Sequence, residues 1–248
     1  MTQISQDKPA LPRRFYTSVD TEECEDGFSI LLDGRKVKTP GKLVLALPGE
    51  GLARALCEEW DAQETHIDPE AMPLTKLANT ALDRVAARRA EIAGEIAGFG
   101  ATDLLCYRAT HPDALIERQA AVWDPLLDWL ETQFNVRLAT TSGVMFQEQD
   151  TAHLARLHEV VGNRGHFCLA GLHFAVSLTG SLVLGLAMAE GRLSADEAHD
   201  LAHLDEAWQA EKWGWDKEAQ DRLEERRRAL AAAGRFMELL DAATSSAA

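Results

Sequence analysis

The sequence predicts an α+β protein in which a small N-terminal antiparallel β-rich domain precedes a larger all-helical domain. Short apolar runs separated by turn residues fill the chain up to Leu47. After Pro48-Gly49 the apolar residues recur every three or four positions, as they do on one face of a helix. With 248 residues, 46% of them hydrophobic, the chain can bury a sizeable core, which excludes a mainly disordered protein. We divide it into a flexible tail over residues 1–12, a β-rich domain with one helix over 13–70, and a helical domain over 71–248.

Four short runs in the β-rich domain are expected to form strands. They read R-F-Y-T-S-V, F-S-I-L-L, K-V-K-T and K-L-V-L-A-L. Asp33-Gly34 separates the second run from the third and predicts a tight hairpin, because both residues tolerate positive φ. Pro40-Gly41 predicts the next turn. A meander of this size is unstable alone, so we expect a helix to pack on one of its faces.

Helical periodicity begins directly after this meander. Leu52, Leu56 and Trp60 share one stripe of the first helix, so Trp60 is expected to be structural. A second helix opens at Pro73, because proline is favoured in the first turn. Residues 113–134 predict a long helix that contains Pro125 and is bent or broken there.

Residues 165–189 carry no formal charge and are numerous enough to span a bilayer. Polar residues such as His166 and His173 oppose that interpretation, and Gly180-Ser181 would break the segment into two helices. We therefore expect a buried helical hairpin without membrane insertion, and a membrane-attached factor remains the alternative. The N-terminus shows neither the apolar run of a signal peptide nor the pattern of a mitochondrial presequence.

The charge and the cysteines exclude further classes. A net charge of −15 leaves no basic footprint for nucleic acid or anionic lipid. The four cysteines form no C-x-x-C pair and are interpreted as small buried side chains in a reducing compartment. Phosphate-binding glycine motifs are also absent from the sequence.

One pair of histidines has metal-ligand spacing. His199 and His203 lie one turn apart in H-D-L-A-H and could bind zinc from one helix face. A zinc protease would carry Glu where this chain has Asp200, and no third ligand is evident from the spacing. Two solvated histidines on a polar helix face are the simpler interpretation. A zinc-dependent hydrolase is kept as the alternative function.

A helical wheel over residues 194–213 separates a core face from a polar face. Ser194 and Glu197 form a capping box, and the helix is expected to run to Trp213 and to end or kink at Gly214. The core side carries Leu201, Leu204, Trp208 and, further along, Trp215, with Glu211 beside them. Glu206 and Trp213 project from the opposite side, a composition typical of a protein-binding hot spot, although another helix could equally cover Trp213.

Four motifs in this order resemble a known family. They are E-E-W-D (58–61), M-P-L-T-K-L-A-N-T-A-L-D (72–83), T-D-L-L-C-Y-R (102–108) and D-E-A-W-Q-A-E-K-W-G (205–214). The chain from about Arg13 to Leu240 resembles the assembly chaperones of the alpha subunit of the F-type ATP synthase catalytic head. The resemblance implies the same two-part fold, no catalysis and no cofactor. It also implies that the protein covers the beta-facing surface of alpha until the hexamer assembles.

The resemblance also assigns residues. It implies partner contacts for Glu206, Glu211, Trp213, Gly214, Asn79, Asp83, Asp103, Tyr107 and Arg108. Trp60 and Trp208 are expected to be structural. We expect a monomeric bacterial cytoplasmic protein, or a mitochondrial matrix protein if the chain is a processed organellar member. The negative charge lies entirely in the helical part, because residues 1–47 are neutral, and it favours steering toward a protein partner.

Overall fold

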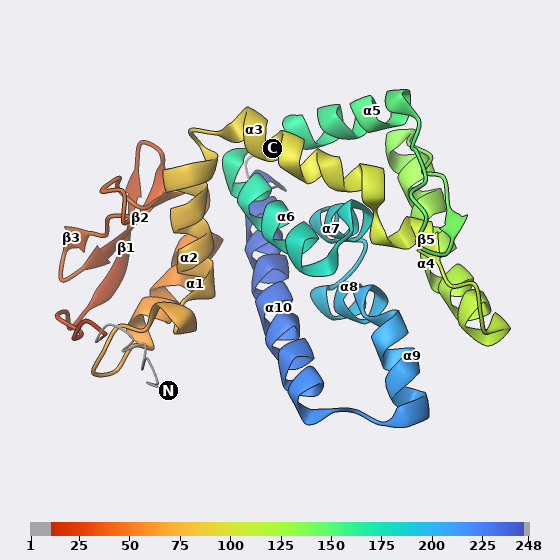
Figure 1. Ribbon diagram of the computed structural model, residues 1–248. Helices are drawn as coiled ribbons and strands as arrows, with labels where there is room; N and C mark the ends of the chain where they lie inside the picture. Colours follow the sequence, from red (N-terminus) through yellow and green to blue (C-terminus); the bar gives the residue numbers. More distant parts are fainter. Residues whose placement is uncertain (1–10, 246–248) are drawn as a thin grey trace, which may run out of the picture.

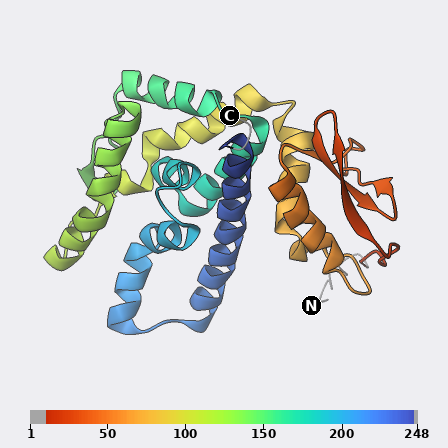
Figure 2. The same cartoon turned by 180° about the vertical axis from the view of Figure 1, so that it is seen from behind.

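The computed structural model of the protein describes residues 11–245 and confirms the predicted α+β class. A four-stranded antiparallel sheet lies at one end of the molecule (Figure 1). Helix α1 (Glu50–Asp61) packs on this sheet, and both α1 and α2 (Pro73–Thr80) contact α10 (Lys217–Ser245) of the helical part (Figure 2). Apart from Leu11 and Pro12, the tail predicted over residues 1–12 lies outside the described residues.

The central strand of the sheet is β2 (Gly27–Leu32), which comes from the predicted run F-S-I-L-L. It pairs with β1 (Val19–Cys24), β3 (Arg35–Lys36) and β4 (Ala46–Leu47). The hairpin at Asp33-Gly34 is confirmed, because Leu32 pairs with Arg35 and the two turn residues have φ of 47° and 76°. Positive φ at both positions is what a two-residue type I′ turn requires.

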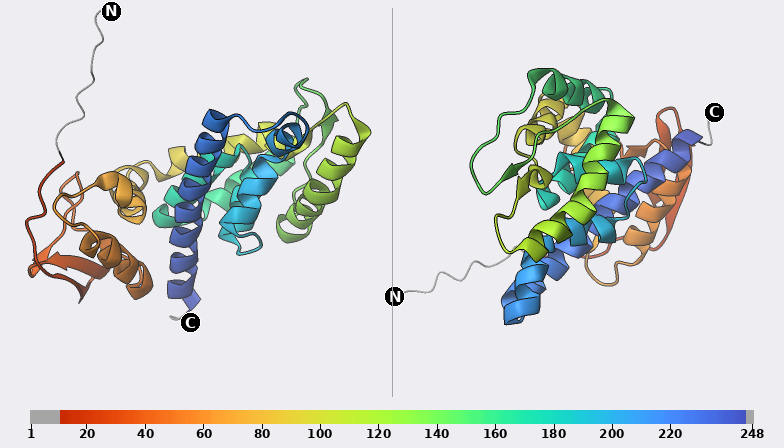
Figure 3. Two further views of the ribbon diagram at one scale, coloured as in Figure 1. Left: turned by 90° about the horizontal axis from the view of Figure 1, so that it is seen from below. Right: turned by 90° about the vertical axis from the view of Figure 1, so that its right-hand side faces the viewer.

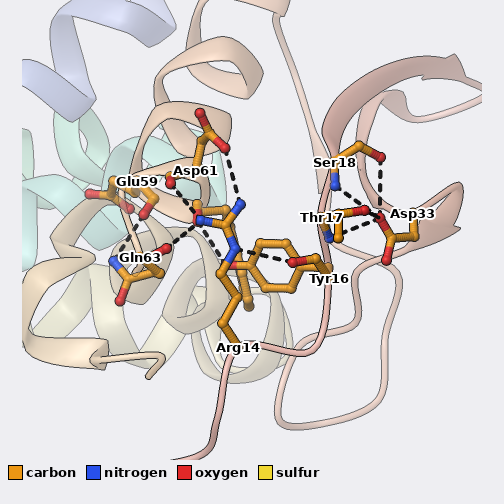
Figure 4. Close-up of polar contacts among 9 residues, drawn as sticks. Arg14, Tyr16, Thr17, Ser18, Asp33, Glu59, Asp61 and Gln63 are labelled. Atoms are coloured by element: carbon orange, nitrogen blue, oxygen red, sulfur yellow. Dashed lines mark hydrogen bonds and ion pairs between the residues drawn. The ribbon is translucent and has the colours of Figure 1, made fainter. Parts of the chain in front are cut away.

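The predicted first strand R-F-Y-T-S-V is wrong, since the strand begins only at its last residue, Val19. The preceding residues instead cross the end of α1, as Figure 4 shows. The Arg14 guanidinium donates hydrogen bonds to the Asp61 carbonyl (2.9 Å) and to the Gln63 carbonyl, and the Tyr16 hydroxyl donates to the Trp60 carbonyl (2.7 Å). These hydrogen bonds hold the segment against the C-terminal end of α1 and the residues that follow it.

The motif E-E-W-D also joins α1 to α2. The Glu59 carboxylate accepts hydrogen bonds from the Leu74 and Thr75 backbone N–H groups (2.7 and 2.8 Å) and from the Thr75 hydroxyl (2.7 Å). It therefore caps the N-terminus of α2, which has no side-chain cap of its own. Trp60 packs against the same cluster of apolar residues as Tyr16.

The elements beyond α2 are mostly helical. A short 3₁₀ turn, η1 (Pro69–Ala71), precedes α2. A π-helical segment, η2 (Ala81–Val85), extends α2, and further 3₁₀ turns occur at η3 (Phe99–Thr102) and η4 (Leu104–Cys106). Two short strands, β5 (Tyr107–Arg108) and β6 (Thr141–Ser142), pair in parallel. The longer helices are α3 (Arg89–Gly98), α4 (Asp113–Phe134), α5 (Thr151–Gly162), α6 (His166–Thr179), α7 (Leu182–Ala189), α8 (Ala195–Ala202), α9 (Leu204–Trp213) and α10 (Lys217–Ser245).

The uncharged segment forms the predicted hairpin. Helices α6 and α7 are separated at Gly180-Ser181, where Gly180 has φ of 68° and the Ser181 hydroxyl caps α7. Every residue of α7 is buried. Among the described residues, no helix combines the length and the apolar character needed to cross a membrane.

The single helix predicted over residues 194–213 is wrong. Its capping box at Ser194 and Glu197 is confirmed, but α8 ends at Ala202 and α9 begins at Leu204. Between them His203 has φ of −113°, and its ring Nδ1 donates a hydrogen bond to the His199 carbonyl (2.9 Å). A side chain that competes for the carbonyl of the preceding turn favours a bend in the helix at this position.

Helix α10 contributes to both hydrophobic clusters of the molecule. Leu230, Ala233 and Met237 pack with residues of α3 to α9, whereas Phe236 and Leu239 pack with the sheet, α1 and α2. Figure 1 shows α10 running between the two groups of elements. The proposed domain boundary at residue 70 remains a prediction. Leu74 and Leu77 of α2, which follow that boundary, pack in the hydrophobic cluster around the sheet.

Phe236→Ala should lower the free energy of unfolding by about 3–5 kcal/mol, because it leaves a cavity where α10 meets α1 and α2. Urea denaturation followed by far-UV circular dichroism measures this loss. Phe15→Ala is the matched control: Phe15 is 74% exposed, and its loss should cost less than about 0.5 kcal/mol. Equal effects of the two substitutions would refute the role given to Phe236.

Candidate protein-binding site

The hollow between α9 and α10 brings together several residues of the last sequence motif. It has a volume of about 370 Å³, and its lining includes Glu206, Trp213, Gly214, Trp215, Arg222 and Arg226. Glu206 and Trp213 come from α9, the two arginines come from α10, and Gly214 and Trp215 lie in the connection between the helices. We call this hollow the α9–α10 site.

The backbone at Gly214 determines how the tryptophans are displayed. Gly214 has φ of 84° and ψ of 165°, a conformation essentially restricted to glycine, and its N–H donates to the Ala210 carbonyl (2.8 Å). Two residues later the Asp216 carboxylate accepts a hydrogen bond from the Ala219 N–H (3.1 Å) and caps α10. The chain therefore reverses abruptly beyond Trp213, which is 82% exposed.

The prediction that Trp215 lies on the core side is wrong. Trp215 is 47% exposed and lines the α9–α10 site. The helix ends at Trp213, so its periodicity does not apply to Trp215, which lies beyond Gly214. Of the two arrangements that the sequence left open for Trp213, the structure shows the exposed one, with 82% of the residue exposed.

Glu211 lies outside the hollow, against α4. Its carboxylate forms an ion pair with Arg118 (2.7 Å), which lowers the pKa of Glu211. The Arg118 guanidinium also stacks over Trp208, with 4.6 Å from its central carbon to the ring centroid, and Trp208 packs against the helical core. This group of three side chains fixes α9 on α4. Of the two predicted glutamates, Glu206 therefore lines the hollow, whereas Glu211 contacts α4.

The basic side of the hollow was missed by sequence reasoning. Arg222 forms an ion pair with Glu218 (2.7 Å), and Arg226 lies 3.5 Å from the Nε2 atom of His203. Their spacing of four residues places both on one side of α10. Nothing in the sequence showed that α9 would fold back opposite that side.

Asn79 and Asp83, from the second motif, lie in a different place. The Asp83 carboxylate accepts hydrogen bonds from the Thr39 hydroxyl (2.5 Å) and from the Gly41 N–H (2.8 Å), and so ties η2 to the turn before β4. Asn79 is half-buried, and its amide oxygen has no hydrogen-bond partner among the described residues. Their predicted partner contacts remain predictions.

Tyr107 and Arg108 form β5, beside the N-terminal half of α4. The Arg108 side chain is only 10% exposed, forms an ion pair with Asp124 (2.8 Å) and donates to the Leu105 carbonyl (2.7 Å). These contacts give Arg108 a structural role. Tyr107 is half-buried.

A surface contact for Asp103 is incompatible with the structure. Asp103 is fully buried, and its carboxylate accepts hydrogen bonds from the Leu105 and Val183 N–H groups (both 3.0 Å) and from the Ser181 hydroxyl (2.8 Å). It joins η4 to the start of α7. Burial outweighs these hydrogen bonds and raises the pKa of Asp103 to about 6.

The histidine pair also has a structural arrangement. His199 and His203 are buried rather than solvated, and their rings stack with centroids 4.4 Å apart. His199 Nε2 donates to the Leu223 carbonyl (3.1 Å), and the Arg226 cation lies beside His203, where burial lowers the pKa of the imidazole. Among residues 11–245 no group of three potential metal ligands gathers, and both rings already bond to backbone carbonyls.

Comparisons with known proteins agree with the fold and with the motifs. Residues 13–131 match the family model described as ATP12 chaperone protein. Over 214 residues the chain is 26% identical to the mitochondrial protein atp12 of Schizosaccharomyces pombe, covering 82% of this chain and 74% of that protein.

Solved structures resemble the chain more closely. Atp12 from Paracoccus denitrificans is 45% identical, with a TM-score of 0.89, over 92% of this chain and 98% of that one. A protein from Agrobacterium tumefaciens is 42% identical, with a TM-score of 0.87, over 93% of this chain and 87% of that one.

The raised pKa of Asp103 makes stability depend on pH. The folded protein binds a proton at Asp103 more tightly than the unfolded chain, whose Asp pKa is near 3.8. Relative to Asp103→Asn, the wild-type free energy of unfolding should therefore fall by up to about 3 kcal/mol as the pH rises from about 4 to about 6, and then level off. Urea denaturation at several pH values measures this difference. A difference that does not fall over that interval would contradict the assignment.

Proposed function

The chain belongs to the ATP12 chaperone family, and on this premise we propose that it is an assembly chaperone of ATP synthase that binds the unassembled alpha subunit. It would cover the surface of alpha that later contacts beta. The family membership supports the assembly role, and the four sequence motifs support alpha as the partner. The α9–α10 site supports a contact surface within the last of these motifs.

The physical task explains why such a protein needs no catalytic centre. A subunit made without its neighbour exposes an apolar face that promotes aggregation. A chaperone has to cover that face and later yield to the proper neighbour, which favours an interface of moderate area with a polar rim. We therefore propose that the chain works by binding alone, without a cofactor.

The observation that carries the site assignment is the exposure of Trp213. Trp213 is 82% exposed at a helix end whose backbone conformation is essentially restricted to glycine, so the fold leaves a large aromatic side chain available to a partner. Glu206 and Arg226 provide charges of opposite sign in the same hollow. An exposed aromatic anchor with polar groups around it is typical of a binding hot spot.

Asn79, Asp83 and Tyr107 are proposed as further contacts only on the basis of the resemblance. They lie outside the α9–α10 site, so they would touch other parts of alpha. We propose that the protein acts as a monomer, in the bacterial cytoplasm or, for an organellar member, in the mitochondrial matrix.

Glu206→Lys and Trp213→Ala should each weaken binding to purified alpha by at least about 30-fold, because each alters an anchor of the hollow. Biolayer interferometry measures the affinity, and co-expression shows whether alpha stays in the soluble fraction. The thermal melt should hardly change, since both side chains are exposed.

Glu25→Lys and Phe15→Ala serve as matched controls. Both residues are exposed and lie in the β-rich part, away from α9 (Figure 1). These variants should bind alpha like the wild type. Full binding by both α9 variants would refute the site, and failure of the wild-type protein to bind alpha would refute the proposed function.

A further inference from the structure

The loop between β6 and α5 exposes three consecutive large apolar side chains. Val144 is 94% exposed, Met145 77% and Phe146 67%. We call these residues the apolar tip. From Ala139 to Gln147 the sequence contains no charged residue. An exposed apolar run of this kind is unfavourable on a protein surface unless it serves binding.

The base of this loop is held by hydrogen bonds. Gln149 is buried, its amide oxygen accepts from the Ala139 N–H (2.8 Å), and its amide nitrogen donates to the Ala139 carbonyl (2.9 Å). On the other side, β6 pairs with β5, and the Gly143 N–H donates to the Arg108 carbonyl (2.8 Å). The right-hand view of Figure 3 shows the green loop before α5 extending beyond the helices.

This construction favours binding. The closed base fixes both ends of the loop, so less conformational entropy is lost when the tip is covered. Gly143 has φ of 87° and turns the chain directly before Val144. The fold therefore presents the apolar residues outward, although burying them against the chain would remove them from water.

We propose that the apolar tip inserts into an apolar depression on the unassembled subunit that the chaperone binds. This inference rests on the proposed function and adds a second contact, separate from the α9–α10 site. The tip continues directly from β6, the partner of β5, whose Tyr107 is already expected to contact alpha. A solitary subunit exposes apolar surface that such a tip can cover.

The surroundings of the tip favour a protein over a lipid surface. Membrane-binding loops and helices combine apolar residues with Lys or Arg. Here the charged residues that follow the tip are the acidic Glu148 and Asp150, the basic residue that precedes it, Arg137, lies further away along the chain, and the whole chain carries −15. That charge opposes both anionic lipid and a second copy of the chain. Three side chains also offer less than the roughly 800 Å² that each partner of a stable dimer contributes.

The test uses the full chain with Val144→Ser, Met145→Ser and Phe146→Ser combined. Its affinity for purified alpha should fall by at least about 30-fold, mainly through faster dissociation, as measured by biolayer interferometry. The control variant combines Leu11→Ser, Phe15→Ser and Leu43→Ser, which removes the same number of exposed apolar side chains elsewhere. It should bind within about twofold of the wild type, and both variants should melt like the wild type.

Four results would overturn the inference. In the first, the wild type binds alpha and the tip variant binds it equally tightly, which would leave the proposed function intact. Sedimentation could show that the substitutions convert a dimer to a monomer, which would make the tip a self-association surface. Flotation with vesicles of phosphatidylcholine and phosphatidylglycerol could show binding that the variant loses. If the wild type fails to bind alpha, the inference fails together with the proposed function.

Discussion

The close contact between α6 and α10 is the constraint on which the rest of the structure depends. A Cβ atom at Gly171 would lie 2.9 Å from Met237 Cγ and 3.4 Å from Phe236 Cδ1, so only glycine lets α10 approach this closely without a shift of its side chains. At this crossing Met237 enters the core of the helical part and Phe236 enters the core around the sheet. One helix thereby joins the two parts of the molecule.

The position of α10 determines where the proposed binding contacts lie on the surface. The N-terminal half of α10 forms one wall of the α9–α10 site, and the C-terminal half is anchored beside α1 and α2. The opposite wall, α9, is held on α4 by Arg118, and the loop that carries the apolar tip follows α4. The α9–α10 site therefore lies on packed helices, and the apolar tip lies on a loop whose base is held by hydrogen bonds, which keeps the cost of ordering both on binding low.

Local rules predicted much of the fold. Asp33-Gly34, Pro73, Gly180 and the Ser194 capping box act through the backbone conformation or the hydrogen bonds of their own neighbourhood, so the sequence was sufficient to place them. Residues with distant partners were misjudged. Asp103 accepts hydrogen bonds from Ser181 and Val183 only because distant segments pack together. For the same reason Arg226 lines the same hollow as Glu206. No local pattern contains that information. The motif that includes Asp103 marks the residue as part of the family pattern, but it does not indicate that the side chain is buried.

Hydrogen–deuterium exchange on the chain with and without purified alpha tests the central claim most directly, because it maps the contact without any substitution. Binding should slow exchange in residues 204–226, which include α9 and the facing turns of α10, and in the loop around residues 143–147. Protection confined to β1–β4, or no protection at all in the presence of bound alpha, would contradict the assignment of the binding surface.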